Sequence, residues 1–389
     1  MHGVSQLDVS IVMPCLNEAD TLGSCLTKAL RSMQENNIAG EIIVADNGSV
    51  DGSLEIAAAH GVRVVKVVAK GYGNALMAGI AEAKGKYVVM ADADDSYDFG
   101  EIPRFLNKLK EGYDFVQGCR LSIGGGTIKP GAMPLLHRWL GNPAFSFMAK
   151  HMFQAPIHDV YCGLRAFNTK AYESLNQRCT GMEFATEMII KASLRKLKIA
   201  EVPITLHPDG RKQHAPHLKT FRDGWRTLRF FLICSPRWLF LIPGLALFLL
   251  GLAGYSLALP GFTIGGVAFD AHTLLVASMA LIVGQQAIFF AIFAKIFSIG
   301  EGLLPPNRSM DRFFSVFTLE KGLAVSSATI VVGICMLFFA VNIWRLNNFG
   351  SLDYSHTMRL VVPGTTLIVL GAQTIFSSFI ISILGIRKK

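Results

Sequence analysis

Short apolar segments alternate with longer mixed segments over the first 120 residues. Five runs rich in β-branched residues predict strands at 9–13, 41–45, 62–68, 87–91 and 114–117. Between them, apolar residues spaced three and four apart predict helices around 19–35, 51–59, 73–84 and 101–111. This β-α-β-α order predicts an α/β domain with a mostly parallel, doubly wound (Rossmann-like) sheet, which binds ligands at the carboxyl ends of its strands.

After about residue 237 the pattern changes to long uncharged runs. Four of them reach the ~20 residues that a helix needs to cross a bilayer, and they lie at 238–259, 273–294, 323–344 and 360–386. Lys and Arg gather in the loop 295–322 and at 387–389, whereas the loop 260–271 has neither, which places both termini in the cytoplasm. We therefore expect three parts: a cytoplasmic α/β domain, a basic amphipathic juxtamembrane segment and an all-α membrane domain. Their predicted ranges are 1–213, 214–237 and 238–389.

Composition agrees with an integral membrane protein. Of the 389 residues, 51% are hydrophobic and 17% are charged, and the mean hydropathy is +0.41, which is too apolar for an ordinary soluble or disordered chain. The seven cysteines include no CxxC pair, which argues against a disulfide framework and a zinc knuckle. The first residues lack the basic and then apolar stretch of a secretory signal, so we expect the first 230 residues to stay in the cytoplasm.

The net charge of +9 is concentrated before the first membrane helix. Residues 191–237 hold eleven Lys or Arg against three acids, which gives this stretch a charge of +8. Such a segment attracts anionic lipid headgroups or a substrate that carries phosphate. We do not expect nucleic acid as a partner, because the stretch ends at a membrane and no nucleic-acid-binding motif accompanies it.

Asp92 and Asp94 directly follow the predicted strand at 87–91. Two carboxylates two residues apart can face the same point, and they suit a hard divalent ion that bridges a diphosphate. The alternative is a polar turn in which Asp94, Asp95 and Ser96 cap the next helix. The position at the ligand edge of a parallel sheet favours the metal site.

Three further turns follow predicted strands. The turns at 14–18 and 46–52 carry carboxylates that could accept hydrogen bonds from a nucleobase or a ribose, although Asn17 and Ser49 could equally cap helices there. The turn at 70–74 contains Gly71 and Gly73 and opens a helix. Its backbone N–H groups could meet a phosphate, and a tight structural turn explains the same residues equally well.

In this order the motifs resemble the family-2 glycosyltransferases of the GT-A fold, and more closely the polyprenyl-phosphate (dolichol-phosphate type) glycosyltransferases. The resemblance spans residues 8 to about 235 and is carried by 9–14, 17–18, 46–51, 71–73, 92–94, 117–120, 162–167 and 181–184. Two positions depart from the family pattern: Ser96 stands where a Gln is usual, and Asn47 stands where many members have a second Asp. The second pair of membrane helices falls outside the resemblance.

The resemblance implies a hexosyltransferase of a bacterial inner membrane that inverts the anomeric centre. One hexose would pass from a nucleotide diphosphate sugar, UDP-glucose before GDP-mannose, to the phosphate of a polyprenyl lipid. Pro14, Glu18 and Asp46 would hold the nucleoside, and Asp92 and Asp94 would bind Mg²⁺ or Mn²⁺ on the donor diphosphate.

This reaction needs positive charge rather than a dedicated base. A lipid monophosphate, with a second pKa of ~6 by analogy with phosphoserine, is already a dianion at neutral pH. We expect Asp94, Arg120 and Arg165 to be catalytic, and the acceptor phosphate to be held by Arg165, Arg211, Lys212 and Arg222. The alternatives are that basic residues near the membrane contact only lipid headgroups, and that Asp159 pairs with Arg165 and makes it structural.

Two competing functions and several details stay open. A processive polysaccharide synthase would carry Gln-x-x-Arg-Trp, which this sequence lacks, and a non-catalytic lipid-handling protein would not need Asp92 and Asp94. The segment 134–153 reads as an amphipathic helix in the membrane interface or as a core helix. The oligomeric state is open, a homo-oligomer included. The second helix pair could form oligomer contacts, shield the lipid or couple to a flippase.

Overall fold

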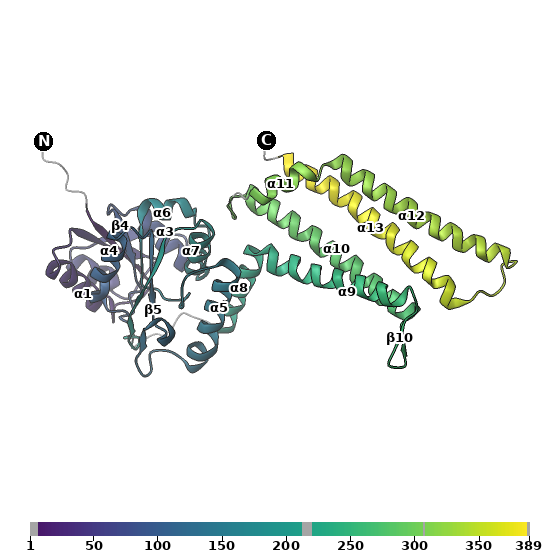
Figure 1. The fold of residues 1–389 in the computed structure, drawn as a ribbon. Coiled ribbons are helices and arrows are strands. Elements are labelled where there is room, and N and C mark those ends of the chain that lie inside the picture. Colours follow the sequence, from purple (N-terminus) through teal and green to yellow (C-terminus); the bar gives the residue numbers. More distant parts are fainter. Residues whose placement is uncertain (1–6, 212–219, 306–307, 387–389) are drawn as a thin grey trace. The chain divides into compact units, whose positions relative to one another are not determined.

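The computed structural model describes residues 7–211, 220–305 and 308–386. The chain forms two compact units, Met1–Phe231 and Leu232–Lys389 (Figure 1). The junction lies inside helix α8 (Thr220–Cys234), within the segment expected to lead into the membrane.

The first unit is built on a seven-stranded sheet with the order β3-β2-β1-β4-β7-β5-β8. Its strands are β1 (Val9–Cys15), β2 (Gly40–Asp46), β3 (Arg63–Lys66), β4 (Tyr87–Met90), β5 (Phe115–Cys119), β7 (Arg165–Asn168) and β8 (Ile199–Pro203). Only β7 runs antiparallel to its neighbours β4 and β5. The predicted mostly parallel sheet is therefore confirmed, and β7 and β8 are additions that the sequence pattern did not reveal.

Helices connect the strands in the expected order. They are α1 (Leu22–Glu35), α2 (Ser53–Ala59), α3 (Tyr72–Ala81), η1 (Phe99–Glu101), α4 (Ile102–Lys110), η2 (Ser122–Gly124), η3 (His137–Gly141), α5 (Asn142–Phe153), α6 (Thr169–Leu175) and α7 (Glu183–Leu194). Two short strands, β6 (Thr127–Ile128) and β9 (Thr205–Leu206), pair in parallel outside the main sheet. The segment predicted as an amphipathic helix thus corresponds to η3 followed by α5.

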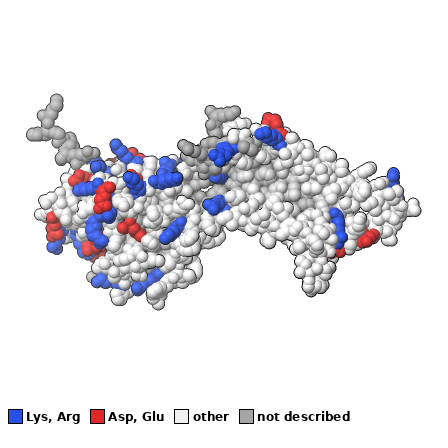
Figure 2. All heavy atoms as spheres, in the orientation of Figure 1, with Lys and Arg blue, Asp and Glu red and all other residues white. Residues whose placement is uncertain are grey.

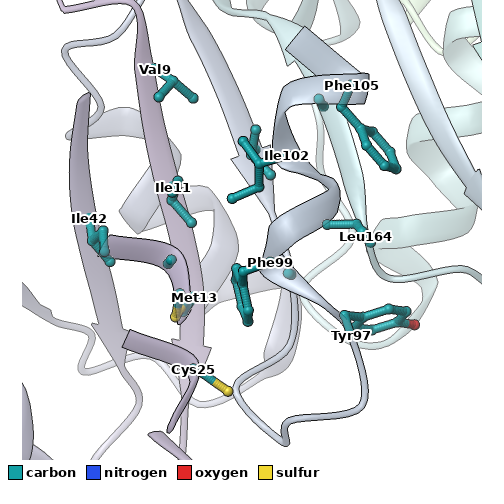
Figure 3. Close-up of a cluster of buried hydrophobic side chains, with 14 of the residues drawn as sticks. Val9, Ile11, Met13, Cys25, Ile42, Tyr97, Phe99, Ile102, Phe105 and Leu164 are labelled. Carbon is teal, nitrogen blue, oxygen red and sulfur yellow. The ribbon is translucent and has the colours of Figure 1, made fainter. Parts of the chain in front are cut away.

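Alternate residues of the central strands pack against helices on opposite faces of the sheet. Val9, Ile11 and Met13 of β1 belong to a core cluster that includes α1 and α4, and Figure 3 shows these side chains beside Phe99 and Phe105. On the other face Gly79 of α3 lies so close to β1 that a Cβ atom there would be 2.6 Å from Cγ1 of Val12. Helices on both faces explain why the central strands β1 and β4 are mostly apolar.

The second unit consists of helices joined by short connections. They are η4 (Arg237–Leu241), α9 (Ile242–Ala258), α10 (Ala271–Gly300), α11 (Arg308–Val316), α12 (Leu319–Leu346) and α13 (Tyr354–Ile386), with a small hairpin of β10 (Thr263–Ile264) and β11 (Val267–Ala268). Four helices are long and apolar enough to cross a membrane: Arg237–Ala258, Ala271–Gly300, Leu319–Leu346 and Tyr354–Ile386. The predicted helical membrane domain is confirmed, and its visible face in Figure 2 is almost entirely uncharged.

Small residues and hydroxyl groups hold these helices together. A Cβ atom on Gly333 of α12 would lie 2.6 Å from the carbonyl oxygen of Gly364 in α13, so the two backbones approach closely, as in packed membrane helices. Tyr255, Ser278 and Thr366 join α9, α10 and α13 through hydrogen bonds of 2.7–3.0 Å between their hydroxyl groups.

Truncation of Phe99 tests the core of the first unit. Phe99 is fully buried, and Phe99→Ala is expected to lower the free energy of unfolding by about 3–5 kcal/mol, because it removes apolar contacts and leaves a cavity. Thermal unfolding of the purified full-length protein, followed by intrinsic fluorescence, would measure the loss. The control is Val50→Ala, since Val50 is 90% exposed. Equal melting temperatures for the two variants would contradict this core.

Candidate active site

The carboxyl ends of β2, β1 and β4 lie side by side and bring together the acidic turns that the sequence identified. Cys15 at the end of β1 is paired with Asp46 at the end of β2, and Val12 of β1 is paired with Met90 at the end of β4. The turns that carry Glu18, Asp46, Asp92 and Asp94 therefore leave one edge of the sheet, as predicted for a ligand site.

Asp92 is held in place by Tyr72. The Tyr72 hydroxyl donates a 2.8 Å hydrogen bond to Oδ1 of Asp92, and Oδ2 lies so close to Gly163 that a Cβ atom there would be 2.5 Å away. Burial, followed by the charge of Asp94, raises the pKa of Asp92 to about 6, whereas the Tyr72 hydrogen bond lowers it. The sequence analysis missed Tyr72, although its position between Gly71 and Gly73 was a usable signal.

Asp94 takes part in a polar turn and also faces a positive charge. Its Oδ1 accepts hydrogen bonds from the backbone N–H of Ser96 at 3.1 Å and from the Ser96 hydroxyl at 2.6 Å. These bonds form a polar turn, but the helix that follows, η1, is capped by Asp98, so the predicted capping role is wrong. Its Oδ2 lies 3.6 Å from Nη1 of Arg211. Ser96 thus fixes one oxygen of Asp94 and leaves the other facing a positive charge.

Arg211 neutralises the acidic residues at this edge. Its guanidinium forms a two-point contact with Glu18, in which Nε lies 2.7 Å from Oε2 and Nη2 contacts Oε1. Nη1 also lies 2.8 Å from Oδ2 of Asp209. Burial alone would lower the pKa of Arg211, but the hydrogen bond and charge of Glu18 outweigh it and raise that pKa above its usual value. Arg211, which was predicted to hold the acceptor phosphate, therefore contacts Glu18 and Asp94, two carboxylates that were predicted to serve the donor.

The donor atoms at this edge fit Mg²⁺ or Mn²⁺ when a ligand supplies the remaining contacts. Within the described residues, no group of three or more His, Cys, Asp or Glu is arranged to hold a metal by itself. Mg²⁺ commonly takes one or two protein carboxylates and completes its shell with substrate phosphates and water. Asp92 and Asp94 offer such a pair, and after burial the charge of Asp94 is the second cause of the raised pKa of Asp92, which a cation would offset.

Asp46 and the glycine turn are used largely by the fold itself. Asp46 is 3% exposed and accepts hydrogen bonds of 3.0 Å from the backbone N–H groups of Gly48 and Ser49. The N–H of Gly71 donates to Oδ1 of Asn47 at 2.7 Å. A Cβ atom on Gly71 or Gly73 would lie 2.4 or 2.3 Å from the backbone oxygens of Thr180 and Cys179, respectively. These contacts favour the tight structural turn over the phosphate site predicted for Gly71 and Gly73.

Arg120 forms a buried ion pair with Asp159. Nε and Nη2 of Arg120 lie 2.7 and 2.9 Å from the two carboxylate oxygens of Asp159, and the Arg120 backbone N–H donates to the same carboxylate at 3.0 Å. Breaking such a pair leaves an uncompensated buried charge, so the two residues act as one unit. Asp159 is therefore the partner of Arg120, and the pairing with Arg165 that the sequence suggested is wrong.

Arg165 is enclosed by the fold. It is 0% exposed, and its guanidinium donates to the backbone carbonyls of Cys162, Val160 and Ala185. Burial lowers its pKa. An enclosed side chain cannot contact a lipid phosphate, so we correct the predicted role of Arg165 from a phosphate contact to a residue that positions the loop at 160–162.

The roles predicted for Pro14, Lys212 and Arg222 stay predictions, because no contact in the structure tests them. Arg222 of α8 has a 55% exposed side chain and lies 3.7 Å from Asp223. Pro14 lies near the end of β1, next to Ala45 of β2. Lys212 is outside the described residues.

Comparisons with known proteins point to one family. The family described as "Glycosyl transferase family 2" matches residues 10–175, and "Glycosyltransferase family 2 C-terminal transmembrane region" matches residues 292–385. The low-salt glycan biosynthesis hexosyltransferase Agl6 of Haloferax volcanii is 35% identical over 382 residues, which cover 97% of this chain and 89% of that protein. The dolichyl-phosphate hexose transferase of the same organism is 34% identical over 198 residues, which cover 51% of this chain and 82% of that protein.

Solved structures show a weaker likeness. Glucosyl-3-phosphoglycerate synthase from Mycobacterium tuberculosis in complex with Mg²⁺ and UDP has a TM-score of 0.46 and 20% sequence identity, covering 58% of this chain and 78% of that one. At this similarity neither its ligands nor its activity carry over to this chain.

Replacement of Asp92 tests the electrostatics of the site. A carboxyl group whose pKa rises from 3.8 to about 6 on folding binds its proton more tightly in the folded state, so it lowers stability as the pH rises through that window. Asp92→Asn removes this effect, and its amide oxygen can still accept the Tyr72 hydrogen bond. We expect the variant in EDTA to be more stable than the wild type by about 1–2 kcal/mol at pH 7.5.

The measurement is thermal unfolding of the full-length protein in EDTA at a series of pH values. The gap between variant and wild type should narrow toward pH 5, where more of the wild-type Asp92 is protonated. A variant less stable than the wild type at pH 7.5 would show that the Asp92 carboxylate is stabilised by its surroundings instead.

Proposed function

The chain belongs to glycosyltransferase family 2 as a membrane glycosyltransferase, and from this premise we propose that it transfers one hexose from a nucleotide diphosphate sugar to a polyprenyl phosphate. The observation that carries the proposal is the carboxylate pair Asp92 and Asp94 at the carboxyl edge of the sheet, in a chain with four membrane-spanning helices. The name of the dolichyl-phosphate hexose transferase supports a lipid phosphate as acceptor. UDP-glucose is our first choice of donor and GDP-mannose the second.

The proposed reaction forms one bond and breaks one. An oxygen of the acceptor phosphate attacks C1 of the hexose, the bond from C1 to the donor diphosphate breaks, and the nucleoside diphosphate leaves with the bonding electrons. Attack from the opposite face inverts the anomeric centre. The acceptor phosphate is already ionised at neutral pH, so the protein must position it rather than deprotonate it.

The chain's own residues orient the donor side. Tyr72 and Ser96 fix one oxygen each of Asp92 and Asp94, so both carboxylates can hold Mg²⁺ or Mn²⁺ without a large loss of side-chain entropy. A bound divalent ion would neutralise the negative charge that develops on the leaving diphosphate. Glu18 and Asp46 would contact the nucleoside, as the family resemblance implies.

The acceptor side is proposed to lie at the cytoplasmic membrane surface. Trp139 of η3 is 71% exposed, and Leu135, Leu140 and Phe147 beside it in sequence are also exposed. The Arg138 guanidinium lies 5.4 Å from the centre of the Trp139 ring. Exposed aromatic and cationic side chains of this kind favour the interface between lipid and water. Arg222 and Lys212 are the cations proposed to meet the acceptor phosphate there.

Transfer by the purified full-length protein tests the proposal. UDP-glucose, GDP-mannose and UDP-N-acetylhexosamines would each be offered with undecaprenyl phosphate in detergent, with Mg²⁺ or with EDTA. We expect one donor to give a lipid that carries a single sugar, and Asp94→Asn to lower the rate by about 100-fold or more, because the leaving diphosphate loses its counter-charge. The matched control is Glu55→Gln, which neutralises an exposed carboxylate of α2.

Three outcomes would contradict parts of this proposal. Products with many sugars would favour a processive polysaccharide synthase. Nucleotide binding without transfer from any donor would favour the lipid-handling alternative. Full activity of Asp94→Asn would remove the carboxylate pair from the mechanism.

A further inference from the structure

Arg211 lies where the proposed donor and its metal would bind. The Arg211 guanidinium donates hydrogen bonds to both oxygens of the Glu18 carboxylate. The side chains of Arg211 and Glu18 are only 12% and 5% exposed, respectively. Asp94, a proposed metal ligand, has one oxygen fixed by Ser96 and the other 3.6 Å from Arg211. The free protein thus already satisfies these carboxylates with a cation of its own.

The backbone holds Arg211 at this place. The N–H of Gly210 donates to the carbonyl oxygen of Asp94 at 3.0 Å, and the N–H of His207 donates to that of Ser96 at 2.9 Å. A Cβ atom on Gly210 would lie 3.0 Å from Cγ2 of Thr21, so a larger residue would press against α1. These bonds fix the main chain beside the turn that carries Asp94. Arg211 would therefore change partners by rotating its side chain, without a movement of the backbone.

A metal ion and the guanidinium cannot both use these carboxylates freely. A divalent ion on Asp94 would place two positive charges next to that of Arg211, in a partly buried setting where screening by water is weak. A nucleoside that needs Glu18 as a hydrogen-bond acceptor finds both its oxygens already engaged. Donor binding therefore requires that Arg211 give up its contact with Glu18, with Asp94 or with both.

We propose that Arg211 is an internal cation that occupies the donor-side carboxylates of the free protein, and that a divalent cation arriving with the donor diphosphate displaces it. This inference rests on the proposed function for the identity of the donor. The displaced guanidinium can then bind the donor diphosphate, which carries negative charge into the site. The planar guanidinium suits this contact because its N–H groups can donate two parallel hydrogen bonds to a phosphate. Arg211 then serves the substrate phosphates only after the donor has bound, so the donor precedes the acceptor.

The inference is tested by the binding of Mn²⁺ alone, without any donor, to the full-length protein in detergent. Free Mn²⁺ would be followed by electron paramagnetic resonance. We expect Arg211→Gln to bind Mn²⁺ about three- to tenfold more tightly than the wild type, because the competing charge is gone. Adding Asp94→Asn should abolish the gain. Equal or weaker Mn²⁺ binding by Arg211→Gln, or no detectable binding, would overturn the proposal.

Arg63→Gln is the matched control. Arg63 also bridges two carboxylates, Glu41 and Glu82, but it begins β3 and so lies at the amino edge of the parallel strands. Its loss should leave Mn²⁺ affinity unchanged. An equal gain in both variants would show that the gain follows from net charge and would overturn the assignment to Arg211.

Arg211→Lys covers the case in which Arg211→Gln does not fold. Lysine keeps a positive charge beside buried Glu18 but lacks the two-point fork, so its Mn²⁺ affinity should lie above that of the wild type. An affinity at or below the wild-type value would overturn the proposal.

Failure of this inference and failure of the proposed function are distinguishable. Absence of hexose transfer by the wild type would refute the function while leaving the Mn²⁺ comparison intact. Transfer by the wild type together with unchanged Mn²⁺ binding by Arg211→Gln would refute only the role of Arg211.

Discussion

The structure of the first unit depends on how it manages negative charge at one edge of its sheet. Parallel strands end side by side, so the acidic turns after β1, β2 and β4 converge whether or not a ligand is bound. Carboxylates this close raise one another's pKa unless a cation or hydrogen-bond donors compensate them. The fold uses both means: Ser96 and Tyr72 donate to Asp94 and Asp92, and Arg211 pairs with Glu18. Asp92 is still incompletely compensated, because burial and the charge of Asp94 raise its pKa to about 6.

Three arginines show why residue type alone does not assign a role. Arg120 is paired through two nitrogens with Asp159, and Arg165 donates to backbone carbonyls. Arg211 pairs with the carboxylates of Glu18 and Asp209. All three were predicted to serve the reaction through their positive charge, yet a buried guanidinium satisfies whichever acceptors surround it. Arg222 of α8, by contrast, has a 55% exposed side chain.

The sequence predicts helices and strands better than it predicts which side chains contact one another. The first five strands follow from β-branched runs and the four membrane helices from uncharged length, because both signals lie within single segments. The sequence pattern does not reveal β7, because this strand is only four residues long and lies antiparallel between β4 and β5. That pairing depends on contacts between residues far apart in the chain. The carboxylate edge follows from topology, but the partners of Arg165 and Arg211 depend on side-chain packing that spacing does not encode. Gly71 and Gly73 pack against the backbone of residues 179–180. The sequence around the two glycines does not predict this contact, because its partner lies more than 100 residues further along the chain.

Polar groups of the helical unit serve to pack its helices together. Within the described residues, the charged side chains of the four spans lie only near the helix ends, and several of the polar side chains in between bond to one another or to helix carbonyls. Tyr255, Ser278 and Thr366 form one such group, and Gln285 donates to the carbonyl of Leu370. A path for a charged headgroup would need polar groups left free for the substrate, because an unpaired charge in lipid is costly. These helices therefore suit anchoring and packing, and the acidic edge at the ends of β1, β2 and β4 belongs to the first unit.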